Sequence, residues 1–188
     1  LVGTDVGFHA RAAGKSGNDP KVLILADSET TYAIDLRKVT PKKGDLKLPT
    51  TVIGHDIKNS FKVLLELGLG LPRVAHDTLV GSFIVNSLAR EQTLTDIAAR
   101  DLGYEGDLEN LDDDQLLQRA SEVASVIAAL ANAQGEQMSE VTSLIKLADT
   151  VDWPVIPVLA RMERAGIKID PTFFASFSES LEGKISDL

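Results

Sequence analysis

The feature that most constrains the fold is a change of hydrophobic period at Gly54. Before it, a continuous apolar run (22–26), a polar tetrad (27–30) and an alternating segment (31–36) follow one another. This succession is typical of a β-hairpin. After Gly54, apolar residues recur at helical spacing. We therefore expect a small sheet first and helices after it, which is the order of an α/β or α+β domain.

Two further strands are expected beside the hairpin, at residues 1–8 and 50–54. The Gly, Ser, Asn and Lys residues at 12–21 have the composition of an exposed loop. Basic and Pro-containing residues from Arg37 to Pro49 form a second loop. The last of these strands leads directly into the first helix.

The helical part contains recognisable starts and ends. A first helix follows Gly54, and Asp77 is expected to cap the second. Thr93 or Thr95 caps a third helix, which ends at Gly103. An acidic helix start is expected at 112–114, followed by a long apolar stripe from Gln115 that is interrupted or re-capped near Gly135. Further helices are expected at 138–148 and from Pro154 to Gly166, and one more starts at Asp170-Pro171.

Composition restricts the classes of function. The chain contains no Cys, which excludes disulfides, thiolate zinc sites and cysteine nucleophiles. No apolar run approaches the roughly 20 residues of a membrane-spanning helix, and the N-terminus lacks the pattern of a signal peptide. We therefore expect a cytoplasmic protein without membrane contact. The net charge of −9 predicts weak DNA binding by the chain alone, because DNA binding depends on Lys and Arg.

Three segments resemble a known family. Gly54–Phe61 and Val74–Ser87 are similar to the second motif region of the 3′-5′ exonuclease domain of bacterial DNA polymerase I, a family A DNA polymerase. Asp152–Asp170 is very similar to the junction between the exonuclease and polymerase domains of these enzymes. The resemblance implies a ribonuclease-H-like fold of the DnaQ exonuclease type, with a mixed sheet flanked by helices. It also implies an exonuclease-like domain at 1–150 and the start of a polymerase domain at 151–188.

The resemblance further implies an active site in which carboxylates hold two divalent metal ions. The family draws these ligands from Asp-x-Glu on the first strand, an Asp that closes the second motif, and an Asp four residues after a Tyr on a later helix. When the second motif is superposed on Gly54 and Lys58, Ser60 replaces its metal-binding Asp. Asp56 takes the family's Asn position, where it either keeps a single metal contact or caps the first helix.

The third motif is also missing. Aligning residues 119–126 with the family helix puts Arg119 at the Tyr position and Val123 at the Asp position. The absence does not depend on this register, since Leu36 and Leu108 lie four residues after the only two tyrosines. The His-x-x-x-x-Asp form of related exonucleases is absent as well. These positions therefore supply no carboxylate.

The first motif allows two alignments. Asp27 and Glu29 follow an apolar run and have the Asp-x-Glu spacing of metal ligands. However, only 24 residues separate Glu29 from Gly54, too few for the two further strands that the family places there. In the competing alignment, which we favour, the tetrad at 27–30 is a hairpin turn. The first strand then carries Asp5, a single carboxylate that no Glu accompanies.

Other candidate binding residues have structural explanations. His55 and His76 lack a third metal-ligand partner at recognisable spacing, so capping or packing explains them better. Apolar residues at helical spacing near the C-terminus are expected to form a buried face rather than a base-stacking platform. These residues are Phe173, Phe174, Phe177, Leu181 and Ile185.

These observations predict a catalytically inactive exonuclease-like domain that supports the polymerase domain of a DNA polymerase I in DNA synthesis and repair. The chain starts at Leu1 and stops at Leu188 within an apolar pattern, so we interpret it as a piece of a longer polypeptide. The chain is expected to need no cofactor of its own. The parent polymerase would use Mg²⁺ and would bring this domain to DNA at the bacterial nucleoid. Two alternatives stay open: a remodelled nuclease that uses Asp27, Glu29 and Asp56 around one metal ion, and a protein-docking module.

Overall fold

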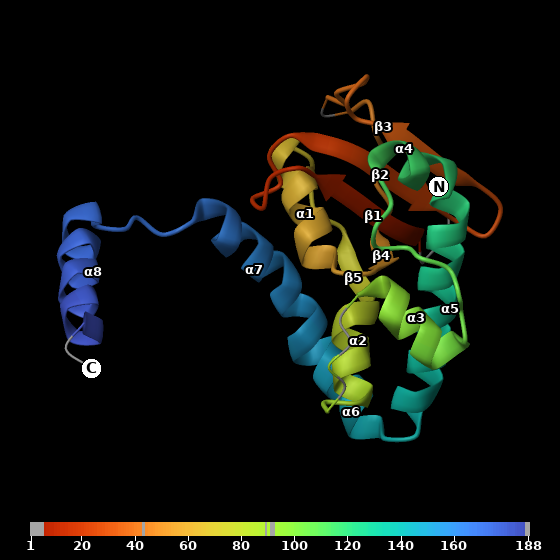
Figure 1. Cartoon of the computed structure of the whole chain (residues 1–188). Coiled ribbons are helices and arrows are strands. Elements are labelled where there is room, and N and C mark those ends of the chain that lie inside the picture. Colours follow the sequence, from red (N-terminus) through yellow and green to blue (C-terminus); the bar gives the residue numbers. More distant parts are fainter. Residues whose placement is uncertain (1–5, 43, 89, 91–92, 187–188) are drawn as a thin grey trace.

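A computed structural model describes residues 6–42, 44–88, 90 and 93–186. Its five strands form one mixed sheet in the order β3-β2-β1-β4-β5 (Figure 1). The strands are β1 (Val6–Ala12), β2 (Pro20–Ala26), β3 (Thr31–Asp35), β4 (Thr51–Gly54) and β5 (Arg73–Asp77). The central strand β1 runs antiparallel to β2 and parallel to β4. The predicted α/β class with a mixed sheet is confirmed.

The hairpin predicted at 22–36 is present as β2 and β3, which pair from Val22↔Asp35 to Ala26↔Thr31. The first strand differs from its prediction at 1–8, because β1 extends to Ala12. Residues 1–5 lie outside the described residues. The sequence signal for the longer strand is weak, since His9 and Arg11 interrupt the apolar residues.

Strand β5 was not predicted. Its segment, Arg73–Asp77, contains one strongly apolar residue, Val74, and precedes a helical pattern. Parallel pairing with β4 completes the strand, from Thr51↔Arg73 to Gly54↔Asp77. Because this partner lies about 20 residues away in the sequence, local patterning does not reveal the strand.

Eight α-helices and one π-helical turn are described. They are α1 (Ile57–Glu66), α2 (Thr78–Val85), α3 (Leu94–Leu102), α4 (Asp113–Gln118), α5 (Ala120–Ser139), α6 (Thr142–Leu147), η1 (Ala148–Asp152), α7 (Trp153–Ala165) and α8 (Pro171–Ser186). Thr93, not Thr95, caps α3, and Gly103 ends it in the left-handed conformation. Asp112 caps α4 in a reciprocal arrangement with Gln115.

Two helix boundaries differ from the predictions. The long helix breaks at Arg119, between α4 and α5, and continues through Gly135. Glycine inside a helix costs only about 1 kcal/mol, which the packing of α5 against the sheet offsets. The segment predicted at 138–148 is shorter as α6, and η1 joins it to α7 without a loop.

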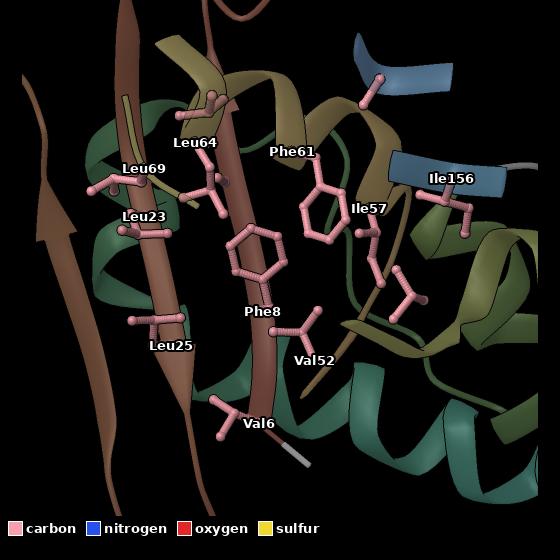
Figure 2. Packing of buried hydrophobic residues seen from close by; sticks show 14 of the residues in the cluster. Val6, Phe8, Leu23, Leu25, Val52, Ile57, Phe61, Leu64, Leu69 and Ile156 are labelled. Carbon is pink, nitrogen blue, oxygen red and sulfur yellow. The ribbon is translucent and has the colours of Figure 1, made fainter. Parts of the chain in front are cut away.

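The sheet has a hydrophobic core on each face. Phe8, Leu23 and Phe61 belong to the core beneath α1 and α7 (Figure 2). Val22 and Ile24 belong to the opposite core, together with apolar residues of α3, α4 and α5. Neighbouring residues of a strand point to opposite faces. The continuous apolar run of β2 is therefore buried on both sides.

Helix α7 is part of this packed body, although it follows the predicted domain boundary at 150/151. Trp153, Ile156 and Ala160 are buried in the core on the α1 side. Lys58 and Lys62 of α1 both form ion pairs with Glu163 of α7, at 2.7 and 2.9 Å. The boundary itself stays a prediction.

Helix α8 stands apart from the body in Figure 1. All five of its apolar residues that were predicted to form a buried face are exposed, and Phe173 is 61% exposed. The prediction of burial within the described chain is wrong, because amphipathic spacing identifies an apolar face but not its partner. Within the described residues, no helix is both long and apolar enough to cross a membrane.

Candidate functional site

A pocket of about 730 Å³ lies where β1, the start of α1 and α5 meet. Its walls also include the β1–β2 loop and residues near 93–94 and 108–109. The tertiary structure brings together three of the predicted positions, because Asp56, Ser60 and Val123 all line this pocket. Two further lining residues, His9 and Arg11, come from β1.

Ser60 is only 1% exposed and forms hydrogen bonds with the backbone of β1. Its hydroxyl accepts a hydrogen bond from the Ala10 amide at 3.1 Å and donates one to the Ala10 carbonyl at 3.2 Å. The pairing of β4 with β1 ends at Phe8, so β4 does not reach these groups. The serine therefore satisfies a buried strand edge that would otherwise lack partners.

The prediction that the Asp56 side chain caps α1 is wrong, because its carboxylate accepts no hydrogen bond from a backbone amide of the first turn of the helix. The backbone of Asp56 is left-handed, with φ of 48°, and its carboxylate accepts a hydrogen bond from the Asn59 side-chain amide. The backbone amide of Ile57, at the start of α1, is buried, and it donates a hydrogen bond to a carboxylate oxygen of Asp77 at 2.8 Å. A residue from the other motif segment thus caps the helix.

Asp77 holds the starts of two helices. One carboxylate oxygen accepts from Ile57 of α1, and the other accepts from Leu79 and Val80 of α2, at 2.9 and 3.3 Å. The predicted capping of α2 by Asp77 is confirmed. Burial raises the pKa of this carboxyl from 3.8 to about 6, against the opposing effect of the three amides. This junction keeps α1 and α2 in a fixed relation.

His9 and Arg11 have the two-residue spacing that the family's Asp-x-Glu motif has on its first strand. The Nδ1 atom of His9 is buried and has no hydrogen-bond partner among the described residues. Burial, followed by the charges of Arg11 and His55, lowers the pKa of His9 to about 3. Arg11 donates to the Leu111 carbonyl and lies 3.9 Å from Asp113.

Sequence reasoning missed both residues because it ended the first strand at Phe8. The available signal was the alternation of Phe8 and Ala10, which are buried, with the polar His9 and Arg11. Asp5, the carboxylate predicted for this motif, lies outside the described residues.

At the third-motif positions, Val123 is buried in the core on the α5 side. Arg119 binds Glu122 at 2.6 Å and also contacts the Tyr104 hydroxyl at 3.1 Å. The hydrogen bonds from Arg119 and Tyr104 lower the pKa of Glu122 to about 2. Arg119 additionally donates to the Asp107 carbonyl at 2.8 Å. The hydrogen bonds of Arg119 thus connect the loop after α3 to the start of α5.

Asp27 and Glu29 lie in the β2–β3 turn and do not line the pocket. Asp27 accepts hydrogen bonds from the amides of Glu29 and Thr30, at 2.9 and 2.8 Å. The hydrogen bonds from these two backbone amides also lower the pKa of Asp27. This geometry agrees with the hairpin-turn alignment of the tetrad.

Both histidines of the motif segments have packing roles, as predicted. His55 Nδ1 lies 2.9 Å from the Thr78 hydroxyl. His76 Nε2 lies 2.8 Å from Gln134 Oε1, and its ring centroid is 5.1 Å from that of Trp153. Burial lowers the pKa of His76. These contacts connect β5 to α5 and α7.

The pocket's side chains do not fit the pair of divalent ions that the fold family implies. Such ions need several oxygen ligands, whereas the pocket holds Ser60 and Val123 at the second- and third-motif positions and His9 and Arg11 on β1. The Ser60 hydroxyl already serves the Ala10 backbone, and Arg11 is a cation. In the described part of the chain, no three His, Asp or Glu side chains gather where they could bind a metal ion.

Comparison with known proteins supports the resemblance found in the sequence. No family model matches the chain. DNA polymerase I of Mycobacterium tuberculosis is 27% identical over 98% of this chain and 22% of the relative. DNA polymerase I of Pseudomonas aeruginosa is 26% identical over 71% of this chain and 16% of the relative. The predicted similarity to DNA polymerase I is confirmed, and the chain spans only about a fifth of these relatives.

Solved structures agree with this similarity. The POL domain of Pol1 from M. smegmatis, in complex with DNA primer-template and dNTP, matches 97% of this chain and 32% of that chain. Its TM-score is 0.76 at 25% sequence identity. Brucella melitensis NrnC bound to pGG matches 89% of both chains, with a TM-score of 0.68 and 17% identity. Together with a further match to the apo form of a nuclease, this likeness confirms the predicted nuclease-type fold.

Proposed function

We propose that this chain is an exonuclease-like domain of a DNA polymerase I that has lost its nuclease chemistry and supports the polymerase domain. The parent would carry out DNA synthesis and repair with Mg²⁺ at the bacterial nucleoid, and the chain itself would need no cofactor. Its similarity to DNA polymerase I supports the parentage. The boundary between the two domains is proposed at 150/151.

The observation that carries the proposal is the state of Ser60. A metal-binding Asp at this position presents its oxygens to the ions, whereas the Ser60 hydroxyl is turned to the Ala10 backbone and forms two hydrogen bonds there. Its neighbours on β1 supply a neutral imidazole and a guanidinium. This part of the pocket serves the stability of the sheet.

The supporting role rests on α7 and α8. Helix α7 is fixed to α1 by its buried residues and by the ion pairs of Glu163. Arg164 adds a further ion pair with Glu66 at 2.6 Å. Helix α8 follows α7 and exposes its apolar face. We propose that the polymerase domain covers this face, so that α7 sets the position of the sheet relative to it.

A nuclease assay tests the loss of chemistry. The chain is incubated with a 5′-labelled single-stranded oligonucleotide and Mg²⁺ or Mn²⁺, and product lengths are compared with those in EDTA. We expect no metal-dependent shortening. Metal-dependent release of 3′ nucleotides that disappears in Asp56→Asn or Asp27→Ala would contradict the proposal. The same variants test the remodelled nuclease, whose carboxylates the structure divides between the pocket and the β2–β3 turn.

A further inference from the structure

The connection between β3 and β4 concentrates positive charge in an acidic chain. Of the 19 Lys and Arg residues in 188 positions, about one is expected in any eleven positions. Residues 37–47 contain five, accompanied by one acidic residue, Asp45. The five are Arg37, Lys38, Lys42, Lys43 and Lys47. We call residues 37–49 the basic loop.

The basic loop is attached to the body at several points. Pro41 and Pro49 are buried, and Leu46 and Leu48 pack against the core on the α1 side. The Asp45 carboxylate accepts a hydrogen bond from the Lys42 amide at 3.0 Å, which closes a turn. In Figure 1 the loop projects beyond the sheet next to β3. Lys42 and Lys47 are therefore presented from an anchored backbone.

The charges of the loop divide into two groups. Arg37 and Lys38 form ion pairs with Asp35, at 2.8 and 3.1 Å. Lys42 and Lys47 are exposed, and neither forms an ion pair with any described residue. The first two cations hold the base of the loop against the sheet. The other two remain available to an external anion.

A third lysine without an ion pair among the described residues lies at the same end of the sheet. Lys15 is in the β1–β2 loop, and this loop follows the end of β1. Antiparallel pairing places the end of β1 beside the start of β2, and the start of β2 beside the end of β3. The β1–β2 loop and the basic loop thus leave the sheet at one end.

We propose that the basic loop contacts the phosphate backbone of DNA, with Lys42 and Lys47 as its free cations. This inference deepens the proposed function and rests on it for the identity of the partner. Lysine is a point charge on a flexible stem, so it binds phosphates without reading bases. Because the chain as a whole carries a net charge of −9, other faces repel DNA and the contact orients the domain.

The test measures binding to labelled duplex DNA by fluorescence anisotropy across a series of salt concentrations. The whole 188-residue chain is used, with EDTA present so that no metal-dependent cleavage occurs. We expect weak, salt-dependent binding. Lys42→Glu/Lys47→Glu should weaken it at least about tenfold at low salt and reduce the slope of log affinity against log salt by about 2, since each phosphate contact contributes about 0.9.

The matched control is Lys146→Glu/Lys168→Glu, which changes the net charge equally on α6 and the linker after α7. We expect this variant to keep the wild-type slope. Unfolding curves of both double variants should coincide with that of the wild type, since all four lysines are exposed.

Three results would overturn the inference: no saturable binding at low salt, equal slopes for the two double variants, or equally tight binding of polyglutamate, which would indicate an acidic protein partner. A failure here leaves the nuclease assay unaffected, because that assay reports metal-dependent cleavage. Conversely, cleavage in that assay overturns the proposed loss of chemistry without changing the salt slope.

Discussion

Each of the two motif segments contains a buried polar residue, a neutral serine at Ser60 and a carboxyl at Asp77. At the pocket, Ser60 takes the position for which the resemblance predicts a metal-binding Asp, and its hydroxyl forms two hydrogen bonds with the Ala10 backbone. At the helix junction, Asp77 remains a buried carboxyl and caps both α1 and α2. The two sites differ in what the backbone requires of the side chain. Asp77 accepts hydrogen bonds from three backbone amides, whereas Ser60 meets one amide and one carbonyl, which a hydroxyl can serve together.

The largest expected effect comes from restoring the family's residue at the pocket. Ser60→Asp places a carboxylate against the Ala10 carbonyl in a buried site, and the effective cost of a buried, poorly paired charge is several kcal/mol. We expect the free energy of unfolding in urea to fall by roughly 3 kcal/mol.

Ser60→Ala is the matched control for that variant. It removes both hydrogen bonds to Ala10 without adding charge, so a loss of about 1 to 2 kcal/mol is expected. A Ser60→Asp variant as stable as the wild type would mean that the pocket still accommodates an acid, and would erase the contrast between the two regions.

The junction region should show an unusual dependence of stability on pH. The pKa of Asp77 rises from 3.8 to about 6 on folding, so the folded state binds the proton more tightly than the unfolded state. The stability linked to this group is therefore highest below pH 4 and decreases as pH rises through about 6. Between pH 4 and pH 7 this contribution should lower the unfolding free energy of the wild type in urea by up to roughly 3 kcal/mol. The same decrease should be absent in Asp77→Asn.

His9 provides a contribution of the opposite sign in the same range. Its pKa falls from 6.5 to about 3 on folding, so its stabilisation is present above pH 6.5 and decreases as pH falls. Both the wild type and Asp77→Asn contain His9, so the difference between their unfolding free energies at each pH reports the contribution of Asp77 alone. Parallel pH profiles for the two proteins would contradict the assignment of the raised pKa to Asp77.

The smallest effect is expected at the wall of the pocket formed by α7. Glu163 pairs with Lys62, whose side chain is only 6% exposed, while Glu163 itself is 42% exposed. Glu163→Gln leaves the Lys62 ammonium poorly compensated, but solvent screening limits the loss in unfolding free energy to about 1 kcal/mol. Glu66→Gln, which removes only the ion pair with Arg164, should cost less. If the two variants lost the same unfolding free energy, the burial of Lys62 would not make its ion pair with Glu163 more stabilising than the pair between Arg164 and Glu66.

Local patterns predicted most of the secondary structure correctly. The hairpin at 22–36, the cap at Asp77, the cap of α3 at Thr93 (one of the two threonines predicted) and the helix end at Gly103 depend on neighbours in the sequence, and all are observed. Strand β5 depends on its pairing with β4, and Arg119 at the helix break contacts Tyr104, which lies 15 positions away in the sequence. For this reason, the strand and the helix break were missed.

The candidate site was predicted in part. Sequence comparison identified Ser60 and Val123 as positions without a carboxylate, and both line the pocket. It did not identify His9 and Arg11, since the alternation that places them on β1 is short and polar. The apolar spacing of α8 was recognised, but its burial was not observed in the described chain.

Apart from β5, the sequence by itself determined the order of strands and helices, and it placed Ser60 and Val123, which carry no carboxylate, at the second- and third-motif positions of the resemblance, because period and motif spacing are local properties. The tertiary structure decided what these positions contact. Only the pairing of β1 with both neighbours, and the approach of α1 to its free edge, turn Ser60 toward Ala10 and bring His9 and Arg11 into the pocket. These contacts join residues about 50 positions apart, and no local pattern encodes them.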